Sequence, residues 1–239
     1  MWPVSDEKIG FDYVLKRFLK GCRMRPARAH VYWNGSFSDA TKRSLVEASL
    51  PPALDGILAD LTERGDNLPA YLWFDQKYYL ADDILAKVDR MSMAHSIEVR
   101  PPFLDHRIVE FAASLPAALK VHGKRQKIIL RELMKGKLPQ TILRRKKVGF
   151  DIPAHQWLRG PLRELLLSTL PAASTEFPGL FHQDRIADSI RRHLERRANL
   201  GYHLWGLLLL FLWMRRWRIQ TTQVSDADRK TPAGMFTSI

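Results

Sequence analysis

Cysteine is nearly absent from this sequence, since Cys22 is the only one in 239 residues. A single thiol excludes an internal disulfide framework and a cysteine-rich zinc cluster. Residues 1–10 include Asp6 and Glu7 and lack the apolar core of a secretory signal. We therefore expect a protein of a reducing compartment, with the cytoplasm as the simplest location.

Long hydrophobic runs are also absent. The most apolar stretch is Leu204–Met214, LWGLLLLFLWM, which is eleven residues long. A helix that spans a bilayer needs about 20 apolar residues. The run therefore predicts a buried core helix rather than a transmembrane segment, with an anchor on a membrane surface as the alternative.

Acidic residues are too few to balance the basic ones: 25 Asp and Glu stand against 38 Lys and Arg, a net charge of +13. The excess is concentrated in residues 16–28, 144–147 (RRKK), 191–197 (RRHLERR) and 215–218 (RRWR). Such patches suit polyphosphate ligands, nucleic acids, acidic lipids or an acidic protein partner equally well. Charge alone does not choose between these ligands.

Apolar residues, by contrast, are plentiful at 46% of the chain, which excludes a disordered protein. Their spacing of three to four residues predicts a mainly α fold. Strands are expected only as short pieces near Val31 and Tyr71, and residues 171–179 are expected to form a loop. The expected helices are residues 11–19, 39–48, 54–63, 84–93, 106–115, 126–134, 157–170, 183–195 and 202–217.

Several polar residues are predicted to cap these helices. Ser38 can accept a hydrogen bond from an amide of the first turn that follows it, and Asp105 can do the same for residues 106–115. Asp82 and Asp83 are interpreted as first-turn acids of residues 84–93, where the helix dipole favours negative charge.

The most informative stretch is Asp89–Asp105, DRMSMAHSIEVRPPFLD. We expect a helical run through Glu98 that is stopped by Pro101 and Pro102. Reactive groups are often presented at such helix ends. We expect His95, Met91 and Met93 to be packed inside this part of the fold, and Trp205 and Trp213 to lie in the core.

Five ordered pieces of sequence resemble one known family. They are residues 89–105, KxxLR at 127–131, LP at 138–139, RKKxGFxxP at 145–153 and LWxLLxLxxW at 204–213. Together they resemble the synthetase half of glutamine-dependent asparagine synthetases, from about residue 16 to 217. The resemblance implies the helical C-terminal part of an α/β adenine-nucleotide alpha-hydrolase-like synthetase domain, with most of its parallel sheet missing.

The resemblance also implies a reaction. Members of this family bind ATP and magnesium, adenylate the side-chain carboxylate of aspartate and let ammonia attack the acyl-adenylate to give asparagine. Lys147 falls on the family's pyrophosphate-side lysine, where a cation offsets the negative charge of the reacting groups. Glu98 falls on the glutamate of ExRxPF, where a carboxylate can accept a proton from the attacking ammonia.

Four further residues are candidates for binding substrate or ATP. Arg100 could hold a carboxylate or phosphate with two hydrogen bonds, or orient Glu98 through an ion pair. Gly149 follows four cations, and a glycine there would let the backbone approach phosphate oxygens, although a charged linker is the alternative. Asp75 and Asp89 are metal or substrate candidates. The identity of any metal ligands stays open.

The sequence departs from the family in two places. It contains no SGGxDS phosphate loop, and Cys22 does not fit the N-terminal nucleophile of the glutaminase. We therefore expect a partial synthetase domain over residues 1–220, a disordered tail over 221–239 and poor ATP binding by the chain alone. Either the sequence comes from a truncated or split gene, or a partner chain supplies the phosphate loop and the glutaminase.

Two other functions remain open at this point. Related enzymes close β-lactam or macrolactam rings by the same carboxylate adenylation, and the motifs do not exclude them. The other alternative is a non-catalytic helical protein whose basic patches bind nucleic acid, which would leave Glu98 and Lys147 unexplained. Nucleic acid is therefore not our expected partner.

Overall fold

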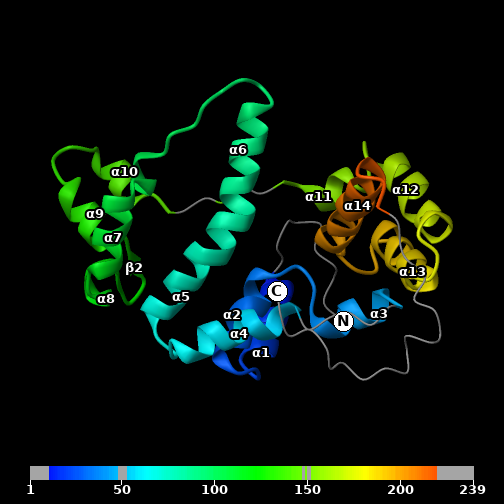
Figure 1. The fold of residues 1–239 in the computed structure, drawn as a ribbon, viewed down its shortest axis with the longest axis horizontal. Coiled ribbons are helices and arrows are strands. Elements are labelled where there is room, and N and C mark those ends of the chain that lie inside the picture. The colour runs from blue at the N-terminus through cyan, green and yellow to red at the C-terminus, as the bar shows by residue number, and fades with distance from the viewer. Residues whose placement is uncertain (1–10, 48–52, 147–148, 150–151, 220–239) are drawn as a thin grey trace, which may run out of the picture. The chain divides into compact units, whose positions relative to one another are not determined.

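The computed structural model describes residues 11–47, 53–146, 149 and 152–219, and the chain divides into two compact units. Unit 1 combines Met1–Ala53 with Ile152–Ile239, and unit 2 is Leu54–Asp151. Figure 1 labels the α-helices of both units. The expected tail over 221–239 lies outside the described residues.

The regular secondary structure described in unit 1 consists of helices and one isolated β-bridge. Its most buried helix is α14, which packs against α11, α12 and α13. The helices of unit 1 are α1 (Phe11–Gly21), α2 (Pro26–Asn34), α3 (Asp39–Leu45), α11 (Ala154–Trp157), α12 (Arg163–Glu176), α13 (Gln183–Leu194) and α14 (Gly201–Arg216).

A dense hydrophobic core holds these helices together. Phe211 is fully buried at its centre, 4.7 Å from the ring of Phe181 and 6.0 Å from that of Phe177 between centroids. Leu204 and Leu208 of the same helix are also buried, which confirms that the apolar run forms a core helix. No described helix is long and apolar enough to cross a membrane.

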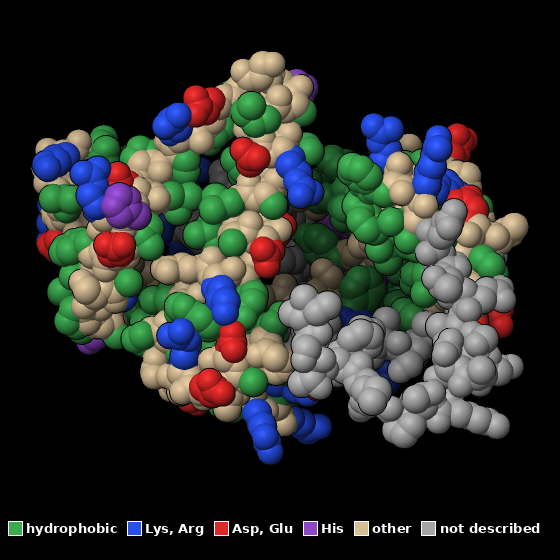
Figure 2. All heavy atoms as spheres, in the orientation of Figure 1, with side chains coloured by type: hydrophobic (Ala, Val, Ile, Leu, Met, Phe, Trp, Pro, Cys, Tyr) green, Lys and Arg blue, Asp and Glu red, His purple; other side chains and the backbone are tan. Residues whose placement is uncertain are grey.

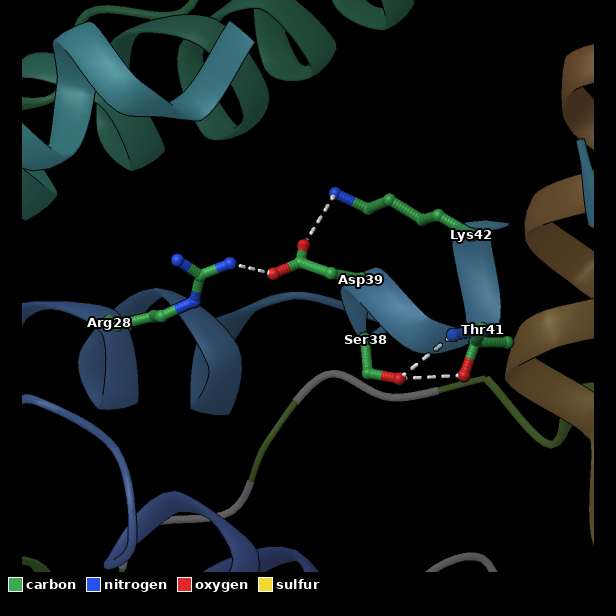
Figure 3. A network of polar contacts seen from close by, with 5 residues as sticks. All are labelled: Arg28, Ser38, Asp39, Thr41 and Lys42. Atoms are coloured by element: carbon green, nitrogen blue, oxygen red, sulfur yellow. Dashed lines mark hydrogen bonds and ion pairs between the residues drawn. The ribbon is translucent and has the colours of Figure 1, made fainter. Parts of the chain in front are cut away.

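Local capping fixes the start of α3, as the sequence predicts. The Ser38 hydroxyl accepts a hydrogen bond from the Thr41 amide at 3.1 Å (Figure 3). Asp39, in the first turn, pairs with Arg28 of α2 and lies 3.9 Å from the Lys42 ammonium. The hydrogen bond from Arg28 lowers the pKa of Asp39, so this network stabilises the ionised carboxylate.

Unit 2 is a chain of shorter elements. A two-residue turn at Gly123-Lys124 joins β1 and β2 as an antiparallel pair in which Val121 is opposite Gln126. The elements are α4 (Ala53–Glu63), α5 (Leu68–Phe74), the π-helical η1 (Asp75–Leu85), α6 (Ala86–Met93), the 3₁₀ turn η2 (Pro102–Leu104), α7 (His106–Ser114), α8 (Ala117–Lys120), β1 (Val121–His122), β2 (Arg125–Gln126), α9 (Ile128–Leu133) and α10 (Gln140–Arg144).

The core of unit 2 is small and lies near its beginning. Leu61, Ala70 and Phe74 are buried, but no residue described between 75 and 146 is. Around this core, Asp60 accepts hydrogen bonds from the Lys77 ammonium and the Tyr78 hydroxyl, both at 2.9 Å. The part of unit 2 that follows residue 74 therefore has little apolar burial to stabilise it.

The mainly helical fold is confirmed, and so are most of the expected helices. In the described part the only strands are β1 and β2. The expected helices at residues 11–19, 54–63, 106–115, 183–195 and 202–217 correspond to α1, α4, α7, α13 and α14.

The strand predictions near Val31 and Tyr71 are wrong, because both residues lie in helices. Proline stands in the first turn of each helix, where its fixed backbone angle favours helix formation. Asn67 also caps α5 by accepting a hydrogen bond from the Ala70 amide at 2.9 Å. These start signals outweigh the strand preference of the aromatic and β-branched residues.

The expected helix over 157–170 and the expected loop over 171–179 are also wrong. The helix is divided into α11 and α12, and α12 continues through Pro171 to Glu176. Leu166, Leu170 and Ala173 are all buried on α12. Tertiary packing of this apolar face maintains the helix across the proline.

The helix at the start of the DRMSMAHS motif ends earlier than predicted. It stops at Met93, and Ser96 adopts a left-handed conformation with φ 57°. Glu98 therefore lies beyond the helix in a segment without regular secondary structure, and the turn at Ser96 rather than Pro101 ends the helix.

Asp82 and Asp83 do not begin a helix, because they lie inside η1, which runs directly into α6. Asp83 instead forms an ion pair with Lys87 at 3.6 Å.

The packing predictions for the motif at residues 89–105 and for the tryptophans of α14 are also wrong in part. Met91 is 61% exposed and Met93 is 55% exposed, and His95 is exposed as well. Trp213 is 51% exposed, whereas Trp205 packs partly buried against the core. The motif is thus a surface feature of unit 2.

Candidate active-site cleft

A cleft of about 550 Å³ lies within unit 2 between α6 and the segment that follows it. One wall is formed by the last residue of η1, Leu85, and by Val88, Asp89 and Ser92 of α6. Their spacing at i, i+3, i+4 and i+7 places them on one side of this helical segment. The lining residues are Leu85, Val88, Asp89, Ser92, Val99, Arg100, Pro101, Pro102, Leu104 and Asp105.

The chain reverses after α6 to build the opposite wall. The Ile97 amide donates to the Ser92 carbonyl at 3.0 Å, and the Ser96 amide donates to the Met93 carbonyl at 3.0 Å. These bonds satisfy carbonyls of the last helical turn. They also direct residues 99–102 toward the face of α6 that carries Asp89.

Two of the predicted site residues, Asp89 and Arg100, line this cleft. The Asp89 carboxylate is exposed and makes no hydrogen bond or ion pair within the described part of the chain. Arg100 extends from the other wall with its side chain 83% exposed. The cleft thus presents a free carboxylate and a guanidinium beside apolar walls.

Glu98 does not line the cleft, but Arg100 holds it at the cleft's edge. The Arg100 Nε donates to Glu98 Oε1 at 2.8 Å, and Arg100 Nη2 lies 2.5 Å from the same oxygen. Both contacts use Oε1 rather than Oε2. Because both side chains are largely exposed, this pair orients Glu98 more than it stabilises the fold.

Asp105 lies at the end of the cleft and has a structural role. Its Oδ1 accepts hydrogen bonds from the amide and the Nε of Arg107, both at 3.0 Å. The Arg107 side chain, followed by its backbone amide, lowers the pKa of Asp105. The predicted cap of α7 is confirmed.

The remaining predicted residues are not brought together here. Asp75 is half-buried in η1 and does not line the cleft. Gly149 is exposed and outside the cleft, and Lys147 lies outside the described residues.

Sequence reasoning missed Ser92 and the apolar lining residues. Helical spacing could have identified Ser92, because it stands three residues after Asp89 on one helix face. The same spacing places Leu85 and Val88 on that face. The opposite wall depends on the turn at Ser96, which no sequence signal marked.

The cleft suits only part of a nucleotide site. No group of three or more His, Cys, Asp or Glu residues in the described part could hold a metal ion. Magnesium, however, is commonly bound by one or two carboxylates together with substrate phosphates. Asp89 fits that limited role, and Arg100 fits the binding of a carboxylate or phosphate oxygen.

A second cleft of about 570 Å³ lies in unit 1 and contains none of the predicted site residues. His182 and Glu47 approach each other there, with Nδ1 and Oε1 3.6 Å apart. Arg43, Asp184 and Arg185 also line it. Its walls carry charges of both signs. None of its lining residues belongs to the five pieces of sequence that resemble asparagine synthetases.

Comparison with known proteins identifies the relationship. The family model described as asparagine synthase matches residues 11–217, most of the chain. This chain belongs to the asparagine synthase family. The match includes both units and the residues around the cleft.

Individual relatives support this result. Asparagine synthetase [glutamine-hydrolyzing] 1 of Bacillus subtilis (strain 168) is 27% identical over 211 residues, covering 88% of this chain and 30% of that protein. A Mycobacterium bovis relative is 33% identical over 187 residues, covering 72% of this chain and 28% of the relative.

A shorter match has a higher sequence identity. Asparagine synthetase [glutamine-hydrolyzing] 3 of B. subtilis is 42% identical over 105 residues, covering 44% of this chain and 16% of that protein. The chain thus spans less than a third of the length of these curated relatives. No solved structure matches it.

Proposed function

We propose that this chain supplies the amide-forming part of an ATP-dependent asparagine synthetase, working with a nucleotide-binding part that is not in this sequence. The observation that carries the proposal is the cleft lined by both Asp89 and Arg100, with Glu98 held beside it by Arg100. Membership of the asparagine synthase family supports the reaction class.

In the proposed first step, the aspartate side-chain carboxylate attacks the α-phosphorus of ATP and pyrophosphate leaves. Both reactants are anions, so positive charge must offset their repulsion. ATP would supply the adenylyl group, and bound magnesium would offset the negative charge of its phosphates. Arg100 would hold a carboxylate or phosphate oxygen, Asp89 would provide a carboxylate for the metal, and Lys147 and Gly149 are assigned to the pyrophosphate, as the family resemblance implies.

In the proposed second step, ammonia attacks the acyl carbon, a C–N bond forms and AMP leaves with the C–O bond electrons. The attacking nitrogen must lose a proton, and Glu98 Oε2 accepts it. The Arg100 contacts to Oε1 support this assignment, since they fix the carboxylate while leaving its second oxygen open.

The substitution Glu98→Gln tests the assignment. Loss of a general base typically lowers a rate by about 10²–10⁴-fold, so we expect that loss in asparagine formation from aspartate, ATP and ammonia. ATP–pyrophosphate exchange with aspartate should be less affected, because it precedes ammonia attack.

Glu110→Gln is the matched control, because Glu110 is an exposed glutamate of α7 outside the cleft. It should retain the wild-type rate of asparagine formation when assayed with the same nucleotide-binding part. A Glu98→Gln variant as active as Glu110→Gln would refute the role of Glu98. Turnover of another acid without asparagine formation would refute aspartate as the substrate.

A further inference from the structure

The helix pair formed by α1 and α2 in unit 1 exposes an apolar stripe. Four side chains of α1 are between 41% and 54% exposed: Val14, Leu15, Phe18 and Leu19. Their spacing at i, i+1, i+4 and i+5 places them on one side of the helix. Trp33 of α2 is 41% exposed and stacks on Phe18, with the ring centroids 5.9 Å apart. We call these five residues the α1–α2 stripe.

The stripe lies on a fixed scaffold, because α1 packs against α2. The Arg17 guanidinium of α1 donates hydrogen bonds to the carbonyls of Tyr32 and Trp33 at 2.8 and 3.0 Å. The Trp33 indole donates in return to the Arg17 carbonyl at 3.3 Å. Gly21 packs so closely against the Trp33 ring that a Cβ would find no room there. Contacts between the two helices therefore hold the stacked rings at the surface.

Basic residues accompany the stripe, and no acidic residue of the same segment offsets them. Arg23 and Arg25 are exposed, and neither side chain forms an ion pair within the described residues. Figure 2 shows Lys and Arg side chains projecting from the part of unit 1 where Figure 1 labels α1. Between Asp12 and Asp39 the sequence contains no Asp or Glu but six basic residues, which are Lys16, Arg17, Lys20, Arg23, Arg25 and Arg28.

This combination favours a bilayer with anionic headgroups over the other ligands of basic patches. The phosphates of lipids and of nucleic acids attract Lys and Arg alike. Aliphatic side chains such as Val14, Leu15 and Leu19, however, gain most from acyl chains, whereas single-stranded nucleic acids stack on aromatic rings. Since α1 has eleven residues, it is too short to span a bilayer and would lie along its surface.

We infer that the α1–α2 stripe binds the surface of an anionic bilayer. Phe18 and Leu19 enter the boundary between headgroups and acyl chains, and Trp33 lies at the interface where aromatic rings gather. Arg23 and Arg25 contact lipid phosphates. This binding does not depend on the proposed catalytic function, because every residue that lines the candidate cleft belongs to unit 2.

Vesicle co-sedimentation of the full chain tests the inference. The chain should bind vesicles of phosphatidylcholine with about 30% phosphatidylserine but not vesicles of phosphatidylcholine alone, and salt should weaken the binding. Leu19→Asp should lower the partition coefficient by about tenfold, since it places a charge in the apolar boundary. The double substitution Arg23→Glu and Arg25→Glu should lower it at least as much, because each cation near such a surface strengthens binding about fivefold.

Leu133→Asp is the matched control, because Leu133 in α9 of unit 2 is 57% exposed and Leu19 is 54% exposed. It makes the same change of charge on an exposed helix and should leave the partition coefficient unchanged. Circular dichroism should show that all variants keep their helical content. Because the replaced side chains are already exposed, their substitution is not expected to unfold the chain.

Four results would overturn the inference: no binding to the anionic vesicles, binding that neither variant weakens, equal weakening by Leu133→Asp, or a homodimer that Leu19→Asp disrupts while vesicles stay unbound. Single-stranded RNA tests the remaining ligand class. If RNA bound the chain, Leu19→Asp weakened that binding and the vesicles did not bind, the stripe would be a nucleic-acid surface and the inference would be wrong.

Discussion

The two units of this protein differ in how they use apolar residues. Unit 1 buries them around Phe211 and Leu204, which are 0% exposed. Unit 2 buries three near its beginning and leaves Met91, Phe103 and Phe111 more than half exposed. The predicted site residues that the structure describes all belong to unit 2. The comparison indicates that apolar burial stabilises unit 1 more than unit 2, and that the candidate cleft lies in the unit with the smaller core.

The largest expected difference between the units comes from matched phenylalanine substitutions. Phe211→Ala should lower the free energy of unfolding by about 3–5 kcal/mol, because it removes a fully buried ring and leaves a cavity. Phe111→Ala should change it by less than about 0.5 kcal/mol, because that ring is 59% exposed. Urea denaturation followed by circular dichroism measures both. Equal losses would contradict the division of roles.

Acid should destabilise unit 1 through His193, which is fully buried. Its Nδ1 accepts a hydrogen bond from the Leu200 amide at 3.2 Å. Burial, followed by the positive charge of Arg159, lowers the pKa of His193 to about 4. The folded protein therefore holds this ring neutral at a pH where the unfolded chain, with a pKa of about 6.5, binds a proton.

The sign of the pH effect follows from this difference. The contribution of His193 to stability is complete above about pH 6.5 and is lost as the pH falls toward 4. Each pKa unit corresponds to about 1.4 kcal/mol, so the loss between pH 7 and 4.5 should be up to about 3 kcal/mol. Urea denaturation at the two pH values measures it.

His193→Gln is the variant that isolates this effect, because glutamine does not titrate. It should lower stability at pH 7 and show a smaller loss between pH 7 and 4.5 than the wild type. The three histidines described in unit 2, His95, His106 and His122, are all exposed. An unchanged pH dependence in the variant would assign the acid sensitivity to other groups.

Short-range features of both units could be predicted from the sequence. The caps at Ser38 and Asp105 and the core helix around Phe211 depend on neighbours a few residues away. Features that depend on distant packing could not be predicted in this way. Pro171 stays helical because of a buried face, and Met91 is exposed because unit 2 builds no core over it.

The candidate site shows the same limit. Motif resemblance identified Glu98, Arg100 and Asp89, and the structure brings the last two into one cleft. The left-handed turn at Ser96 creates that cleft, and no residue type at this position signals it, since glycine is the usual choice there. Predicting the cleft required the backbone conformation, whereas predicting its charged groups did not.

The smallest expected effect tests whether local rules act equally in both units. Ser38→Ala and Asp105→Ala each remove a side chain that accepts a hydrogen bond from an amide of the following helix. Each should reduce the protection of its own helix, α3 or α7, by about 1 kcal/mol, because the amide loses its partner. Hydrogen exchange resolved by segment measures this. If α7 responded no more than α8, which has no side-chain cap, its helical state in unit 2 would depend on something other than its cap.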